Sequence, residues 1–148
     1  MYTGVEIDFV VKDSLAALKE YQAIFQDALK VVEQTSFGPG MNEVVFNLYG
    51  VRFHLLDENH EYHLFAPTKE NPNTIWFNVV VANIEETFSR ALEQGATVIQ
   101  ELTQMEAMGI TNAMFLDNFN YVWMLQQIHR EVNFEEREQF FKSEFDLD

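Results

Sequence analysis

The sequence has 148 residues, of which 47% are hydrophobic and 22% are charged, a balance that is typical of a folded domain and excludes a wholly disordered chain. The formal net charge of −15 repels phosphate backbones and anionic lipids, so we expect no nucleic acid and no membrane as a partner. The sequence contains no cysteine, which excludes disulfides, thiolate catalysis and cysteine–zinc sites.

The N-terminus has no basic segment followed by an apolar one, so no signal peptide is predicted. No apolar run approaches the length of a membrane span. We therefore expect a cytoplasmic protein.

The first half of the chain predicts one strand, one helix and three further strands. Asp13 is placed to cap the helix. The apolar residues of that helix have the spacing of one stripe, and they are Leu15, Leu18, Tyr21 and Phe25. Strands are predicted at residues 5–11, 29–35, 43–48 and 51–56.

The second half repeats this order after a polar segment with two prolines, residues 58–73, which we interpret as a linker. Asn83 is predicted to cap a helix, with Glu86 as its reciprocal partner, and Gly95 ends that helix. Strands are predicted at residues 74–81, 96–102, 109–116 and 121–127.

A constant offset of 70 residues relates the two halves. It pairs Asp13 with Asn83 and Leu55 with Leu125. The fold class is therefore α+β, with two tandem β-α-β-β-β modules at about residues 4–57 and 74–128. A generic α+β domain with an accidental likeness between its halves is the alternative.

The last segment predicts a helix over about residues 133–145, capped by Asn133 with Glu136 as the reciprocal residue. It contains four phenylalanines among charged residues: Phe134, Phe140, Phe141 and Phe145. The helix either packs on its own domain, which is the commoner outcome, or binds a partner.

Several stretches resemble one superfamily in their order and spacing. They are Val10–Leu18 with Tyr21–Phe25, Ile84–Leu92 with Gly95–Ala96, Asp117–Leu125, and His129–Glu136. These resemble the first strand and helix, the second helix, the last turn and strand, and the tail of vicinal-oxygen-chelate proteins. This superfamily includes glyoxalases, bleomycin-resistance proteins and dioxygenases, and the last two stretches resemble its PhnB-like branch.

The resemblance implies a single domain over residues 1–148, in which both modules form one cupped mixed sheet with a C-terminal helical appendage. The sequence departs from the branch in the last turn, where Asn118 replaces the usual proline and Asn120 the frequent glycine. Because asparagine tolerates the left-handed backbone conformation, we expect the turn to survive.

The resemblance also places the superfamily's four usual metal ligands, two from each module, at Glu6, His54, Trp76 and Met124. The 70-residue offset selects the same four positions. Glu6 and His54 can bind a divalent metal, whereas Trp76 has no lone pair to donate and Met124 offers only a soft thioether. The predicted metal site is therefore incomplete, and we expect either no cofactor or a weakly bound divalent metal.

Strand alternation adds four polar neighbours to this face, namely Asp8, Arg52, Asn78 and Gln126. The opposite face carries the apolar residues expected under the helices: Ile7, Phe9, Phe53, Leu55, Phe77, Val79, Trp123 and Leu125. The eight site residues are predicted to line a ligand cup. Alternatively, Glu6 and Asp8 only form ion pairs with Arg52, and His54 is a structural hydrogen-bonding residue.

If Glu6 is buried beside Asp8, repulsion should raise one of the two pKa values and so create a candidate general base. His60 and His63 have the spacing of helical metal ligands, but they lie in the linker, where an exposed polar loop is expected.

Three functions follow from these features. The first is a metal-independent binder of a small, cationic or aromatic molecule, and the second is a metal-dependent lyase, isomerase or dioxygenase in which Asp8 or Gln126 assists Glu6 and His54. The third is an interaction or scaffold protein that acts through the C-terminal helix or a sheet edge. The resemblance also implies a homodimer.

Overall fold

The computed structural model describes residues 3–146, so the outermost two residues at each end of the predicted domain lie outside the described part. The first module contains β1 (Ile7–Val11), α1 (Ser14–Phe25), the 3₁₀ turn η1 (Gln26–Ala28), β2 (Leu29–Gln34), β3 (Glu43–Leu48) and β4 (Val51–Asp57). The second contains β5 (Phe77–Val80), α2 (Ile84–Glu93), β6 (Thr97–Met105), the 3₁₀ turn η3 (Glu106–Met108), β7 (Ile110–Leu116) and β8 (Val122–Ile128). The linker holds the 3₁₀ turn η2 (His60–Tyr62), and the chain ends in α3 (Phe134–Glu144).

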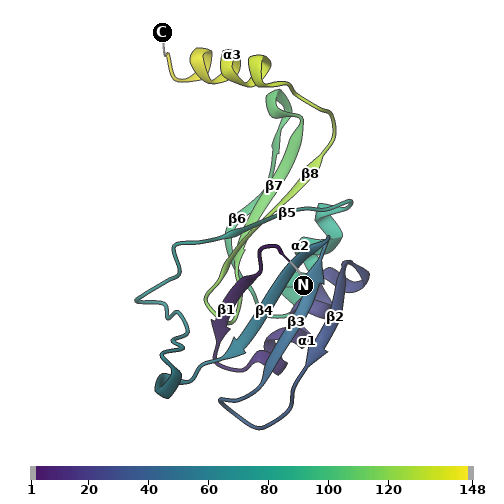
Figure 1. Cartoon of the computed structure of the whole chain (residues 1–148). Helices are drawn as coiled ribbons and strands as arrows, with labels where there is room; N and C mark the ends of the chain where they lie inside the picture. The colour runs from purple at the N-terminus through teal and green to yellow at the C-terminus, as the bar shows by residue number, and fades with distance from the viewer. Residues whose placement is uncertain (1–2, 147–148) are drawn as a thin grey trace.

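The strands form two four-stranded mixed sheets with the same topology, β1-β4-β3-β2 and β5-β8-β7-β6 (Figure 1). In each sheet the first strand runs parallel to the fourth, and the remaining pairs are antiparallel. The pairing register also repeats with the predicted offset, because Phe9 lies opposite Leu55 and Val79 lies opposite Leu125. The α+β fold of two tandem β-α-β-β-β modules is therefore confirmed.

The back faces of the two sheets share one aromatic core with α1 and α2. Phe77 in β5 contacts Phe9 and Phe53 of the other sheet, with ring centroids 5.4 Å and 5.3 Å away. Trp123 is fully buried and packs on Tyr21 of α1 and on Phe77. Such aromatic pairs add to the free energy gained by burying apolar area. The predicted apolar layer under the helices is thus confirmed.

The helix ends follow the sequence signals. The side chain of Asp13 accepts a hydrogen bond from the amide of Ala16 at the start of α1, and Asn83 accepts one from Glu86 at the start of α2. Asn133 caps α3 in the same way. These bonds satisfy amides that have no partner within their helix.

Strands β1 and β5 begin later than the sequence predicted, and each change leaves a site residue just outside its strand. Pairing of β1 with β4 begins at Ile7, so Glu6 precedes β1. β5 begins at Phe77 because the Asn73 side chain accepts a hydrogen bond from the amide of Ile75 and holds this segment as a turn. Trp76 therefore lies in the approach to β5.

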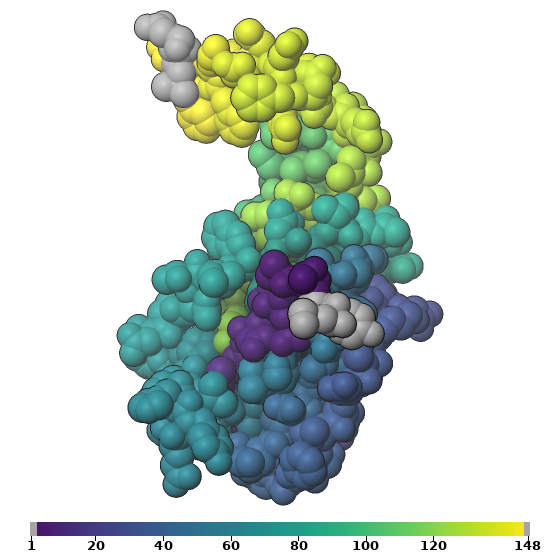
Figure 2. Space-filling model, in the orientation of Figure 1, coloured from purple at the N-terminus to yellow at the C-terminus, as the bar shows by residue number. Residues whose placement is uncertain are grey.

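The C-terminal helix projects from the body. In Figure 1 it lies at the far tip of β6, β7 and β8, and Figure 2 shows the same segment standing out from the lower mass. None of its described residues is buried. Among residues 3–146, the helix contacts η3 and Arg130 pairs with Glu136, so its packing on its own domain is limited to this end of the body.

Across the described residues, no helix combines the length and apolar character needed to cross a membrane.

Candidate functional site

Four of the eight predicted site residues meet on the open face of the first sheet. Asp8 lies opposite His54 in the parallel β1–β4 pair, and Arg52 lies two residues before His54 on β4. Glu6, just before β1, reaches back to both β4 side chains. One ligand atom from each of Glu6, Asp8 and His54 lies within 4.8 Å of the others.

Glu6 and Arg52 form the closest contact in this cluster. Arg52 Nε donates to Glu6 Oε2 over 2.6 Å. This hydrogen bond is the main cause that lowers the pKa of Glu6, and the side chain is 32% exposed rather than buried. Of the two ion pairs with Arg52 that the structural alternative predicted, the one with Glu6 is present and keeps Glu6 ionised, whereas the charged partner of Asp8 is His54.

Asp8 has the opposite shift. Loss of hydration, followed by its contact with Glu6, raises the pKa of Asp8 above the ordinary aspartate value. The predicted rise of one pKa in this pair therefore falls on Asp8, although the side chain is more than half exposed. The Asp8 carboxyl group can therefore keep a proton at a higher pH than the Glu6 carboxyl group can.

His54 is enclosed by carboxylates on both sides of its ring. Its Nδ1 lies 3.2 Å from Glu6 Oε1 and 3.6 Å from Asp8 Oδ2. Its Nε2 lies 3.3 Å from Glu43 Oε2, but the two groups are not aligned as a hydrogen bond. The Nε2 atom is also shielded from water, and it has no hydrogen-bond partner in the described residues.

Glu43 was not predicted from the sequence, although its position could have been. The turn at Tyr49 and Gly50 sets Leu48 opposite Val51, and this register places Glu43 on the same face as His54. Its carboxylate therefore adds a third acidic group around His54.

The other four predicted residues belong to the second module. Asn78 lies opposite Met124, and Gln126 Nε2 approaches Met124 Sδ at 3.8 Å. Trp76 is 58% exposed and lines an apolar groove of about 430 Å³. The groove is also lined by Ile7, Leu48, Tyr49, Val51, Phe53, Phe77, Asn78, Val79 and Val80.

The two sets of predicted residues do not meet. Asp8, Arg52 and His54 lie on the open face of the first sheet, and Asn78, Met124 and Gln126 lie on that of the second. The back faces of both sheets contribute to the shared core. Within residues 3–146, no hydrogen bond or ion pair joins Glu6, Asp8, Arg52 or His54 to the second set. The cup lined by both sets therefore stays a prediction.

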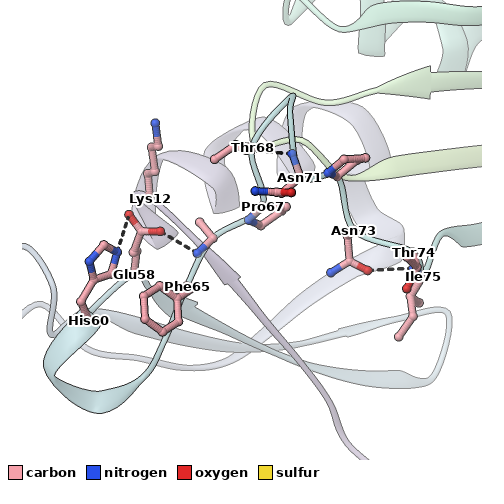
Figure 3. A pocket seen from close by; sticks show the side chains of 12 residues that line it. Lys12, Glu58, His60, Phe65, Pro67, Thr68, Asn71, Asn73, Thr74 and Ile75 are labelled. Atoms are coloured by element: carbon pink, nitrogen blue, oxygen red, sulfur yellow. Dashed lines mark hydrogen bonds and ion pairs between the residues drawn. The ribbon is translucent and has the colours of Figure 1, made fainter.

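The linker forms a second, wide cavity of about 810 Å³, shown in Figure 3. His60 is mostly exposed, contacts the ring of Phe65 at a tilt of 32° and lies 3.6 Å from the Glu58 carboxylate. Glu58 also accepts the amide hydrogen of Ala66. As the sequence predicted, His60 and His63 lie in an exposed segment, and neither belongs to the cluster around His54.

Neither a protein-family model nor a curated protein matches the sequence. Solved structures do match the fold. The fosfomycin resistance protein FosX from Listeria monocytogenes superposes with a TM-score of 0.63 and 19% identity, over 93% of this chain and 99% of FosX. The PhnB protein from Bacillus cereus has a TM-score of 0.62 and 17% identity, over 84% of this chain and 99% of that chain.

TioX from Micromonospora sp. ML1 is a further match, with a TM-score of 0.61 and 14% identity, over 88% of this chain and 100% of TioX. At these identities the likeness concerns the fold, since one fold can host many functions. All three neighbours belong to the superfamily that the sequence motifs resemble. The chain therefore has the vicinal-oxygen-chelate fold.

Proposed function

We propose that this protein binds a small molecule through a divalent metal ion held weakly by Glu6, Asp8 and His54. The observation that carries the proposal is the convergence of three potential ligand atoms within 4.8 Å. Asp8 compensates for the two positions, Trp76 and Met124, that offer no suitable donor.

The donor set fits such an ion. Two carboxylates and one imidazole suit Mn²⁺ and similar divalent metals. Ligand atoms bonded at about 2.0–2.2 Å and at right angles lie about 3 Å apart, and His54 Nδ1 is 3.2 Å from Glu6 Oε1. Arg52 occupies only Oε2 of Glu6, so Oε1 remains available.

A FosX structure that matches this fold was solved in complex with Mn(II) and 1S,2S-dihydroxypropylphosphonic acid. By analogy, a metal bound here would polarise an oxygen atom of the bound molecule. Three protein ligands on a partly exposed face should bind the ion weakly, because water can reach it.

The arrangement of the two open faces also leads us to propose a homodimer. We further propose a cytoplasmic location, which fits a sequence without cysteine. The second face supplies neutral side chains, Asn78, Met124 and Gln126, which suit the wall of a binding site rather than its metal. A second copy could present this face to the Glu6, Asp8 and His54 cluster, since no hydrogen bond or ion pair joins the two sets within the described residues of one copy. The enclosed site would then favour an aromatic or amphipathic molecule.

A metal-dependent lyase, isomerase or dioxygenase is the second candidate. It is favoured by the raised pKa of Asp8, since a carboxylate that accepts a proton readily can act as a general base. In this candidate Glu6 and His54 hold the metal while Asp8 exchanges a proton with the substrate.

Titration of the purified, chelator-treated protein with Mn²⁺ separates these possibilities. We expect close to one ion per chain in the wild type and a weaker affinity in Asp8→Asn and His54→Ala. His60→Ala, which changes an exposed linker histidine, is the matched control and should bind as the wild type does. Equal binding by all four proteins would refute the proposed site. A metal-bound wild type that leaves candidate carbonyl or epoxide substrates unchanged would favour binding over catalysis.

A further inference from the structure

The two ring nitrogens of His54 have different surroundings, and this difference carries a further inference. Nδ1 faces Glu6 and Asp8, which supply the other potential metal ligands. Nε2 faces Glu43 on the neighbouring strand, 3.3 Å from Oε2. The geometry points to Glu43 as a positioning residue that accepts the Nε2 hydrogen of His54 and leaves the Nδ1 lone pair for the metal. This inference rests on the proposed metal function.

The need for such a partner follows from burial. Nε2 is shielded from water and lacks an aligned hydrogen bond within residues 3–146, although buried polar atoms in proteins are almost always paired. Glu43 Oε2 is already close enough that a small rotation of either side chain would align the bond. A neutral histidine carries its ring hydrogen on either Nδ1 or Nε2, but not on both. The hydrogen bonds around the ring decide which nitrogen carries the hydrogen.

Glu43 is well placed to impose this choice because its backbone is fixed. The Glu43 amide donates to Thr35 Oγ1 over 3.0 Å, and the Thr35 amide donates to the Glu43 carbonyl over 2.9 Å. These two bonds close the end of the β2–β3 pair. The carboxylate therefore starts from a defined position beside β4.

The chemical consequence is specific. A carboxylate that holds the distal N–H of a metal-binding histidine fixes the ring orientation and makes the ligating nitrogen a better donor. Here that partner would make His54 an Nδ1 ligand. Losing such a partner typically weakens metal binding by about 10- to 100-fold.

The test begins on the metal-free protein. We would record the ring ¹⁵N shifts of His54, assigned by comparison with His54→Asn, at a pH where the shifts no longer change. Without metal, Glu6 and Asp8 attract the ring hydrogen to Nδ1 while Glu43 attracts it to Nε2. The expected result is a larger Nε2–H fraction in the wild type and in Glu43→Gln, whose amide oxygen still accepts a hydrogen bond, than in Glu43→Ala. Glu101→Ala, which removes an exposed carboxylate from β6, is the control for net charge and should keep the wild-type fraction.

Mn²⁺ titration of the wild type, Glu43→Gln, Glu43→Ala and Glu101→Ala completes the test. Glu43→Ala should bind about 10- to 100-fold more weakly than the wild type, and Glu43→Gln should recover part of this loss. An Nε2–H fraction that stays unchanged in Glu43→Ala would overturn the role of Glu43 even if the metal binds. The expected tautomers without any Mn²⁺ binding would support the orientation of His54 by Glu43 and refute the proposed function instead.

Discussion

The hydroxyl of Tyr21 in α1 donates a 2.6 Å hydrogen bond to Asp117 Oδ2 in the turn between β7 and β8. The same buried carboxylate accepts bonds from Trp123 Nε1 and from the amides of Phe119 and Tyr121. Asp117 therefore ties the first helix to the last turn of the second module. Burial raises the pKa of Asp117, while these four donors oppose that rise.

We expect Asp117→Asn to lower the free energy of unfolding by about 3 kcal/mol, because an amide can accept fewer of these bonds and leaves buried donors unpaired. Urea denaturation measures this loss. Tyr21→Phe removes one donor only and should cost about half as much. If Asp117→Asn proves as stable as the wild type, the carboxylate is not a structural centre.

We expect the ionisation of Tyr121 to lower the stability of the fold at alkaline pH. Burial raises its pKa to about 12, and its hydroxyl donates a 2.7 Å hydrogen bond to the carbonyl of Val10. Because this value lies above that of an unfolded tyrosine, the contribution of Tyr121 to stability is complete below about pH 10. That contribution is lost as the pH rises through 12.

Denaturation of the wild type and Tyr121→Phe at several alkaline pH values tests this expectation. The variant should be less stable near neutral pH, and the gap should narrow as the pH rises from 10 to 12. A gap that stays constant over this range would show that Tyr121 ionises in the folded protein as freely as in the unfolded chain.

Arg52 should oppose metal binding rather than assist it. Its guanidinium holds Glu6 Oε2 and places a positive charge beside the proposed ion. A divalent ion and a unit positive charge about 4 Å apart in water repel by about 2 kcal/mol, so Arg52→Gln should bind Mn²⁺ about thirtyfold more tightly. Calorimetric titration gives the affinity. Weaker binding by this variant would instead mean that Arg52 must hold Glu6 in place.

The C-terminal helix should be dispensable for folding. Because α3 buries none of its described residues, a chain that ends at residue 132 should keep its melting temperature within about 2 °C. Thermal denaturation followed by circular dichroism measures this. A fall of about 10 °C or more would show that α3 packs on the body in solution.

Much of the fold was predictable because local signals agreed with one another. Asp13 and Asn83 cap their helices as predicted, and the alternation around Phe9 and Trp123 identified the buried faces. Asn120 has a positive φ of 69°, which is the left-handed conformation expected where the related turn has glycine.

The assembly of the site was less predictable, for a physical reason. Alternation assigns His54 and Met124 to the open faces of their strands, but it carries no information about how two sheets pack on each other. Packing of both back faces on a shared core separates these residues within one chain. The contact between Glu43 and His54 likewise depends on tertiary register, which the sequence encodes only through the turn at Tyr49 and Gly50.

We propose above all that Glu6, Asp8 and His54 hold a divalent metal together. Electron spin-echo spectroscopy of the Mn²⁺-loaded protein tests it most directly, because the method detects nitrogen bonded to the ion and distinguishes ¹⁵N-labelled histidine from other nitrogen. We predict a signal from one directly bound histidine nitrogen in the wild type and in His60→Ala, and no such signal in His54→Ala. A Mn²⁺ spectrum without histidine nitrogen, or one that survives in His54→Ala, would contradict the proposed site.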